Sequence, residues 1–392
     1  MYVKINYRFS VAKVIILIAW TLSLFGYFFQ FPFSRLSSLI VPGLAIYLIG
    51  LFINRKTLNI ERQWLIIYLI YLLYLLLMIG ISVIQRVEFG TIIRFFLVLS
   101  IIPLFAIIRI EDFKNEYRIF ILLAVAKSIL LLYFAIILIR TGSYIELRNW
   151  AEVNHYGDIY INPYTHLPKV QVHGNGILPM VLILSISYGK RGVINTIINL
   201  VLALGTFSAG NSAYLLGIAV FCIYRLYINV TKRGKSNWIK MLSVIILIVG
   251  GVAFMAYAIY ILSLKSGYSD AIRLEQAKAL MDNYIVVGNG LGHKIFYVGE
   301  MRSYSGDTYF ELQTLYIFNQ IGLVGLFMFY WLTIKPIKKI GRYEMMLFLI
   351  YLLYTFWNPY CFDSTEMIVV SLLTNYSIYT RQHDNTYKES GD

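Results

Sequence analysis

The chain has 392 residues, of which 59% are hydrophobic and 14% are charged, and its formal net charge is +14. Soluble domains carry roughly 25% charged residues, so this composition excludes an ordinary soluble protein. The positive charge does not indicate a nucleic-acid partner, because cytoplasmic loops of membrane proteins are rich in Lys and Arg. Cys222 and Cys361 are too few for a disulfide framework. No CxxC or HExxH pattern points to a metal, so no metal and no cofactor are predicted.

Apolar segments recur from one end of the chain to the other, and the longer ones can cross about 30 Å of hydrocarbon. The first is not a cleavable signal, because no small-residue cleavage site follows it and further spans come at once. We predict an all-α polytopic membrane protein with a single integral membrane domain, residues 1–392. About twelve transmembrane helices are expected, over 14–30, 36–53, 64–84, 91–108, 119–139, 176–188, 193–207, 211–228, 239–262, 311–334, 344–357 and 364–380.

Basic residues gather in alternate connections between these segments and so orient the chain. One set of connections carries the Lys and Arg clusters, whereas the other holds little more than Arg35, Arg86 and Arg94. The positive-inside rule therefore predicts cytoplasmic N- and C-termini. Two connections on the opposite side are long, over 140–175 and 263–310. Loops longer than about 15 residues are usually functional or disordered, and these are rich in aromatic and ionisable residues, so we expect folded surfaces without access to cytoplasmic nucleotides.

The second long loop contains the segment AIRLEQAKALMDNYIVV after Ser269 and Asp270, whose side chains suit a helix start. Its apolar residues at helical spacing predict an amphipathic helix along the membrane surface. The stretch VVGNGLG at 286–292 ends that helix. Its spacing is neither G-x-G-x-x-G nor a P-loop, so a nucleotide-binding turn is not predicted. Gly288 and Gly290 permit positive φ and are interpreted as a hinge that turns the chain toward the next span.

The next span opens at Glu311 and contains Gly322 and Gly325, which allow close helix packing. An arginine-led helix, a G-x-G-x-G turn and a polar residue opening a span that continues Q-x-G-x-x-G resemble the bacterial O-antigen polymerase and ligase superfamily. Residues 270–330 carry most of the resemblance. It implies a GT-C-like protein of the bacterial cytoplasmic (inner) membrane with two enlarged periplasmic loops.

Residues 205–220, GTFSAGNSAYLLGIAV, resemble the small-residue turn that this superfamily has between two spans. The turn often reads Ser-Arg-Gly in the family, whereas Ala209-Gly210-Asn211 stand here. No role for an arginine is therefore carried over to this position.

The resemblance implies a glycosyltransferase that uses undecaprenyl-diphosphate-linked sugar units. A hydroxyl at the non-reducing end of the acceptor attacks the anomeric carbon of the donor, and undecaprenyl diphosphate leaves. Cleavage of the glycosyl–phosphate bond drives the transfer, and the family is held to need no metal. Such a site needs cations for the diphosphate, an acceptor for the hydroxyl proton, and a path for the lipid tail.

Arg273 matches the arginine of the family's loop helix, and guanidinium offers forked donors suited to phosphate oxygens. We expect it to bind the diphosphate, with a surface arginine that reaches lipid head groups as the alternative. Glu311 stands near the position where ligases of this superfamily have a histidine. We expect it to act as the base, with a helix-terminal acid favoured by the macrodipole as the alternative.

Four residues of the first long loop are candidates for binding substrate. Arg148 and Lys169 are expected to hold acceptor diphosphate or acidic sugars, Trp150 to stack on a sugar face, and His173 to lie at the cavity edge. The three histidines of this loop lack the spacing of metal ligands. Taken singly, each of these residues has a structural role as its simpler explanation.

Two further candidates lie outside that loop. Lys127 falls in the middle of the span ILLAVAKSILLLY, where a cation is costly and usually faces a cavity or a partner. We expect it to contact lipid diphosphate or to pair with a carboxylate, unless the span boundary is misplaced. His293 follows the glycine turn and is a weaker candidate for substrate binding.

Glutamate in place of the ligase histidine favours a repeat-unit polymerase over a ligase that joins polymer to lipid A core. A flippase or secondary transporter is the alternative from another class, but no internal repeat is found, and such carriers place many ionisable residues along a central cavity. Expected partners are lipid-linked repeat units, membrane lipid, a chain-length regulator and a flippase.

Overall fold

The computed structural model describes residues 11–53, 61–108, 113–141, 144–162, 166–189, 192–231, 267–281, 286–308, 310–356 and 360–375, with residue 358 and isolated positions between 238 and 250. Helices dominate these residues. The bundle contains α1 (Val11–Phe29), η1 (Ser34–Leu39), α2 (Ile40–Ile53), α3 (Arg62–Ile84), α4 (Phe89–Ile107), α5 (Lys114–Thr141), α7 (Leu178–Tyr188), α8 (Val193–Ser208), α9 (Ser212–Thr231), α12 (Gln313–Ile340) and α13 (Arg342–Thr355). A last helical segment covers 364–375.

Five helices in the described part of the chain are long and apolar enough to cross a membrane. They cover Ser34–Phe52, Arg62–Ile84, Phe89–Ile107, Lys114–Thr141 and Gln313–Ile340. The prediction of a mostly helical, membrane-embedded chain is confirmed in this form. The predicted span 239–262 lies outside the continuously described residues. Helices α7 and α8, and the apolar part of α9 (Ser212–Ile228), are shorter than a full span of about 20 residues.

Two β-hairpins depart from the all-α prediction. In the first long loop, α6 (Tyr144–Val153) precedes β1 (Gly157–Ile161), which pairs antiparallel with β2 (Pro168–Val172). In the second, α11 (Gly267–Met281) precedes β3 (Ile295–Tyr297), which pairs antiparallel with β4 (Tyr304–Asp307). These strands have only three to five residues, too few for a clear period-two pattern to emerge among loop residues.

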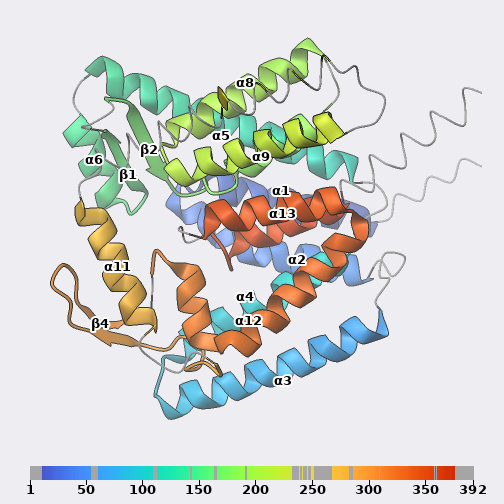
Figure 1. Ribbon diagram of the computed structural model, residues 1–392, viewed down its shortest axis with the longest axis vertical. Coiled ribbons are helices and arrows are strands. Elements are labelled where there is room, and N and C mark those ends of the chain that lie inside the picture. Colours follow the sequence, from blue (N-terminus) through green and yellow to red (C-terminus); the bar gives the residue numbers. More distant parts are fainter. Residues whose placement is uncertain are drawn as a thin grey trace, which may run out of the picture.

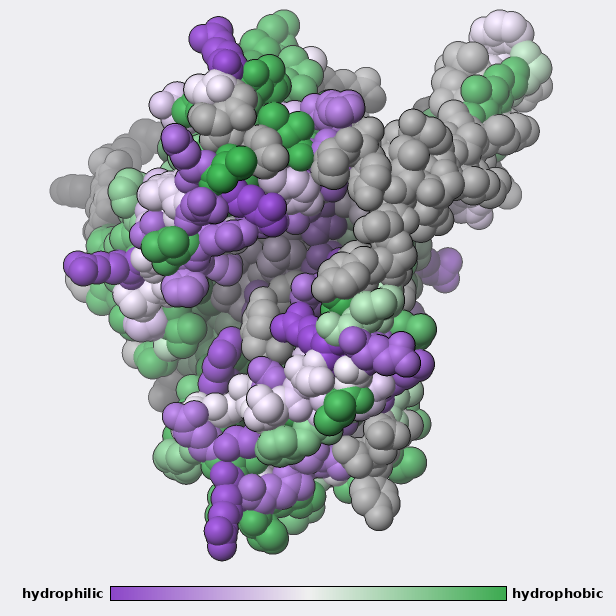
Figure 2. Space-filling model, turned by 90° about the vertical axis from the view of Figure 1, so that its left-hand side faces the viewer, coloured by the Kyte–Doolittle hydropathy of each residue, from purple (hydrophilic) through white to green (hydrophobic). Residues whose placement is uncertain are grey.

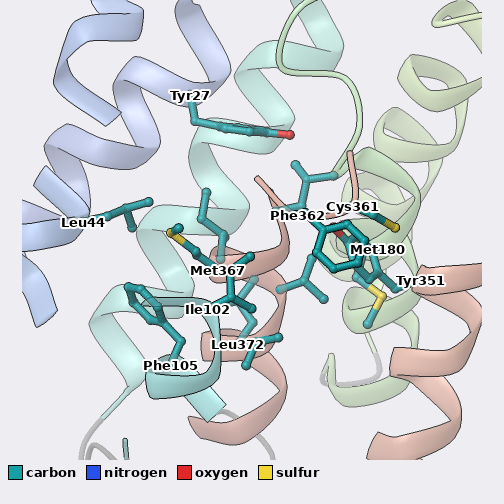
Figure 3. Close-up of a cluster of buried hydrophobic side chains, with 14 of the residues drawn as sticks. Tyr27, Leu44, Ile102, Phe105, Met180, Tyr351, Cys361, Phe362, Met367 and Leu372 are labelled. Carbon is teal, nitrogen blue, oxygen red and sulfur yellow. The ribbon is translucent and has the colours of Figure 1, made fainter. Parts of the chain in front are cut away.

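The helical segment 364–375 forms the centre of the bundle. Its apolar residues from Met367 to Leu373 are buried, with no side that faces lipid. Figure 3 shows Met367 and Leu372 in one cluster with Ile102 and Phe105 of α4. Its polar residues Glu366, Ser371, Thr374 and Asn375 are buried as well, so the whole segment lies in the interior. Helices such as α3, whose exposed positions are large aliphatic residues, form the apolar outer surface instead.

The two long loops lie on the same side of the helix bundle. Figure 1 shows α6, β1 and β2 above α11 and β4, all beyond one end of the helices. We call residues 144–175 the first loop module and residues 267–311 the second loop module. Figure 2 looks onto this side and shows hydrophilic residues gathered over both modules, with the surface hollowed between them.

Candidate functional site

Helix α11 carries the predicted diphosphate ligand Arg273. It begins at Gly267, two residues before the predicted start, and its inner face of Gln276, Ala279 and Leu280 is buried. This face packs toward α12. Leu274, expected on the apolar face, is 59% exposed. The prediction that the apolar face lies along the membrane is therefore wrong for Ala279 and Leu280, because α12 covers them.

The two predicted catalytic side chains lie next to each other. Arg273 Nε is 3.6 Å from Glu311 Oε2, and the side chains are 34% and 51% exposed. At this distance the pair attracts without a normal hydrogen bond, and Arg273 Nε has no hydrogen-bond partner. A half-exposed ion pair contributes about 0–1 kcal/mol to stability. The arrangement places a cation and a carboxylate side by side at the start of α12, with about a third of the Arg273 side chain open to solvent.

The glycine turn 286–292 docks into a break in α12. Gly288, Gly290 and Gly292 all have positive φ, at 93°, 95° and 70°. Gly322, inside α12, has φ 62° and ψ −175°, which interrupts the helix. Side chains rarely adopt positive φ, so the turn and the break depend on glycine at these positions.

The docking replaces the hydrogen bond that the break removes. In an unbroken helix Val324 N–H would donate to Gln320 O. Here Gly290 N donates to Gln320 O (3.0 Å), and Val324 N donates to Val286 O (3.3 Å). Gly292 N also donates to the Gln320 side-chain Oε1 (2.8 Å). The glycine backbone therefore binds α12, and the expected hinge is a fixed joint between α12 and the second loop module.

In the first loop module, the charge of Arg148 is balanced by two acidic neighbours. Its Nε lies 3.1 Å from Glu152 Oε1 and 3.0 Å from Asp158 Oδ1, and its guanidinium lies 5.7 Å from the Tyr160 ring centre. Burial raises the pKa of Asp158, while Arg148 beside it acts in the opposite direction. Arg148 thus ties α6 to β1 through its Nε and one terminal nitrogen, Nη2.

Lys169 and Trp150 are also built into the first loop module. Lys169 faces Tyr160 across the β1–β2 pair, with Nζ 5.7 Å from the ring centre. Its stem lies against Gly210, where an added Cβ would meet Lys169 Cγ at 2.5 Å. Trp150 packs on Phe134 with ring centres 6.0 Å apart. Trp150 remains 38% exposed, so one edge can still reach a ligand.

Lys127 and His173 form a chain of contacts between α5 and the first loop module. Lys127 is fully buried, its Nζ donates to His173 O (2.9 Å), and it lies 5.1 Å from the Phe31 ring centre. His173 Nε2 lies 2.9 Å from His155 O. Burial of the His173 ring, together with Lys127, lowers its pKa, although the His155 contact opposes this. Among the described residues Lys127 contacts no carboxylate, and it is buried away from the surface, so it supports the backbone at His173.

His293 lies where the glycine turn meets the α3–α4 corner. Its Nδ1 lies 2.9 Å from Gln85 Oε1, and Tyr316 OH donates to its carbonyl oxygen (2.9 Å). Burial lowers the pKa of His293. These contacts link α3, α12 and the turn, and the half-buried ring lies beside the joint rather than at the Arg273–Glu311 pair.

The turn that resembles the family's Ser-Arg-Gly motif is held by amide side chains. Asn211 Nδ2 donates to Asn358 Oδ1 (2.8 Å), and Asn211 Oδ1 accepts from Ala213 N (3.0 Å) at the start of α9. Gly210 has φ 68° and lies against Lys169. The turn itself carries no cation, because Ala209, Gly210 and Asn211 are uncharged.

Sequence reasoning missed two acids at the start of the central helical segment, Asp363, which is partly buried, and Glu366, which is fully buried. Asp363 Oδ1 accepts from Thr365 N (2.7 Å), and Glu366 Oε2 accepts from Phe362 N (2.9 Å). Glu366 is fully buried and its Oε1 has no hydrogen-bond partner. The sequence Asp-Ser-Thr-Glu at 363–366 resembles a capping box, and that signal could have identified both residues.

Within the described ranges, no group of three or more His, Cys, Asp or Glu side chains could hold a metal ion. Comparisons of the chain with protein-family models, with characterised proteins and with solved structures gave no match.

Proposed function

We propose that this chain polymerises undecaprenyl-diphosphate-linked oligosaccharide repeat units into O-antigen or capsular polysaccharide. The observation that carries the proposal is the meeting of Arg273 and Glu311, 3.6 Å apart, at the start of a long apolar helix. The sequence alone predicts complementary roles for the two residues in one reaction. The site lies on the side of the bundle that carries both loop modules (Figure 1).

In the proposed reaction, the acceptor hydroxyl oxygen attacks the anomeric carbon of the donor sugar. Glu311 takes the hydroxyl proton as general base, a contribution of typically 10²–10⁴-fold in rate. The bond between the anomeric carbon and the phosphate oxygen breaks, and undecaprenyl diphosphate leaves with the bonding electrons. Arg273 stabilises the charge that develops on this leaving group.

The proposed setting is the bacterial cytoplasmic membrane, with both termini in the cytoplasm, about twelve spans and a GT-C-like architecture. The five helices able to cross a membrane and the shared side of the two loop modules support it. Partners are the lipid-linked units and membrane lipid, with a chain-length regulator and a flippase in the same pathway. Trp150 and Lys169 are the remaining residues that face an acceptor sugar in this proposal.

Reconstitution with one defined undecaprenyl-diphosphate-linked repeat unit tests the proposal. Purified protein in liposomes should produce a ladder of glycans that differ by one repeat unit, without added nucleotide or metal. Release of undecaprenyl diphosphate should equal the number of linkages formed. A protein that leaves the unit unextended, or a reaction that stops when chelator is added, would contradict the proposed polymerisation or its metal-free chemistry.

Ligase and flippase activities are the alternatives, and cellular phenotypes separate them. Loss of a polymerase leaves single repeat units on the final acceptor, loss of a ligase leaves polymer on the carrier lipid, and loss of a flippase leaves no exposed units. Buried ionisable side chains would favour a transporter. However, Lys127 donates to His173 O and Glu344 accepts from Tyr188 OH (3.0 Å), so these charges hold neighbouring elements together.

A further inference from the structure

Gln276 joins the helix that carries Arg273 to the backbone beside Glu311. Its side chain is 2% exposed. Oε1 accepts from Leu312 N (2.9 Å), and Nε2 donates to Tyr304 OH (3.3 Å). A buried amide is costly unless both its ends are paired. These two partners satisfy it, which fixes the orientation of the amide.

The hydrogen bond between Gln276 and Leu312 N affects the geometry of the proposed site. Gln276 follows Arg273 by three residues, so the two side chains emerge from adjacent turns of α11. Leu312 directly follows Glu311 and precedes α12. One side-chain hydrogen bond therefore sets the distance between the turn that carries the cation and the residue that carries the carboxylate.

Aromatic packing holds the second partner of Gln276 in place. The Tyr304 ring centre lies 5.2 Å from that of Phe310, which lies 4.7 Å from that of Tyr316 in α12. Tyr304 is 3% exposed. Because these rings pack against one another, Tyr304 OH is a fixed acceptor for Gln276 rather than a mobile one.

The preceding residue, Glu275, has a separate task. Its carboxylate accepts from the backbone N–H groups of Glu300, Met301 and Arg302 at 2.9–3.1 Å. Although partial burial acts in the opposite direction, these bonds lower the pKa of Glu275. Glu275 thus holds the turn between β3 and β4, whereas Gln276 holds the start of α12, and the pair provides a matched comparison within one helix.

We propose that Gln276 is a positioning residue that sets the spacing of Arg273 and Glu311 for glycosyl transfer. The inference rests on the proposed function for its catalytic meaning, and on the contacts above for the geometry. Displacement of a reacting group by about 1 Å can cost on the order of 10²-fold in rate. Loss of the Gln276 bond should therefore lower turnover without removing any group that binds substrate.

The kinetic test uses three variants in the reconstituted full-length protein. Gln276→Met keeps the size of the side chain but removes both hydrogen bonds, and should lower kcat by about tenfold or more while KM for the lipid-linked unit stays within about twofold. Gln276→Glu keeps an acceptor for Leu312 N and should recover most of that loss. Glu275→Ala should stay within about threefold of wild type. Equal losses of kcat for both Gln276 variants, or a rise in KM with unchanged kcat, would overturn the inference.

A second measurement reports the spacing without turnover. Arg273→Cys and Glu311→Cys are combined with Cys222→Ser, since Cys222 is exposed and Cys361 is buried. Thiol crosslinkers of graded length then give the shortest reagent that joins the pair. With Gln276→Met added, joining the two thiols should require a longer crosslinker, or a wider range of crosslinker lengths should succeed, whereas Glu275→Ala should change neither. An unchanged range of crosslinker lengths in the Gln276 variant would refute the positioning role. If the wild-type protein extends no glycan, the proposed function fails, and this measurement still decides whether Gln276 sets the spacing.

Discussion

The two loop modules lie on the same side of the bundle, but they use their arginines differently. Arg148 in the first module contacts two carboxylates at 3.0–3.1 Å, which balance its charge, and the contact with Asp158 joins α6 to β1. Arg273 in the second module faces one carboxylate at 3.6 Å, and its Nε has no hydrogen-bond partner. The Arg148 guanidinium is shared between two carboxylates, whereas that of Arg273 has one acidic neighbour, so Arg273 is the better placed to bind an anion.

The difference extends to the way each module is attached. Side chains hold the first module to the bundle, through Lys127 on His173 O and the aromatic packing of Trp150. Backbone groups add to the side-chain bonds in the second, through the glycine turn bound to the break in α12. We infer that the second module is sensitive to substitution at the glycines of its turn. Four predictions test this contrast, in order of decreasing effect.

The largest effect is expected from Glu311→Gln. Removal of the proposed base should lower polymerisation by on the order of 10²–10⁴-fold, with normal amounts of folded protein because the side chain is half exposed. Glu300→Gln on the β3–β4 turn is the matched control, since Glu300 is exposed and only its backbone N–H is used. Rates come from the glycan ladder in liposomes. Wild-type activity of Glu311→Gln would remove the base role.

The arginines of the two modules are compared directly by alanine substitution. Arg273→Ala should lower kcat by about 10²–10³-fold, the cost of losing one group that stabilises developing charge. Arg148→Ala should cost less than about tenfold, because it breaks part-exposed ion pairs worth about 0–1 kcal/mol each. The measurement is kcat and KM for the lipid-linked unit. Similar losses for both variants would erase the proposed distinction between the modules.

The backbone joint is tested at Gly288. An added Cβ would lie 2.5 Å from Gln320 O at φ 93°, so Gly288→Ala should destabilise the protein by about 2 kcal/mol or more. Gly80→Ala is the control, because no atom lies within 4 Å of its added Cβ in α3. That change should be neutral or stabilising by up to about 1 kcal/mol. Thermal unfolding in detergent measures both, and equal midpoints would show that the turn is not a rigid joint.

The smallest effect concerns pH. Burial lowers the pKa of His293 in the folded protein, so below the unfolded-state pKa of about 6.5 the unfolded chain binds a proton more readily than the folded one. Stability should therefore fall as pH falls from 7.5 to 5.5, and His293→Gln should flatten this dependence. Midpoints of thermal unfolding at stepped pH provide the measurement. A slope identical to that of wild type would indicate that His293 is equally accessible to protons in both states.

Some of the site was predictable because it depends on local sequence. Arg273 stands in a helix whose start was expected at 269–270, and Glu311 stands two residues before α12 begins. The role of Lys127 was not predictable from the sequence, since its hydrogen-bond partner is a backbone carbonyl 46 positions away along the chain. The two hairpins were missed because their strands are short and lie inside loops rich in polar and aromatic residues.

The sequence by itself determined that the chain is helical and membrane-embedded, because runs of apolar residues exceed the thickness of the hydrocarbon layer. It also identified the glycines of VVGNGLG as a place where the backbone must turn. Only the tertiary structure decided what those glycines contact. Asn289 N and Gly290 N donate to the carbonyl oxygens of Asn319 and Gln320, beside the break at Gly322, and no local pattern encodes that pairing. The proximity of Arg273 to Glu311 was likewise decided by the tertiary structure, because it depends on the packing of α11 against α12 rather than on either segment alone.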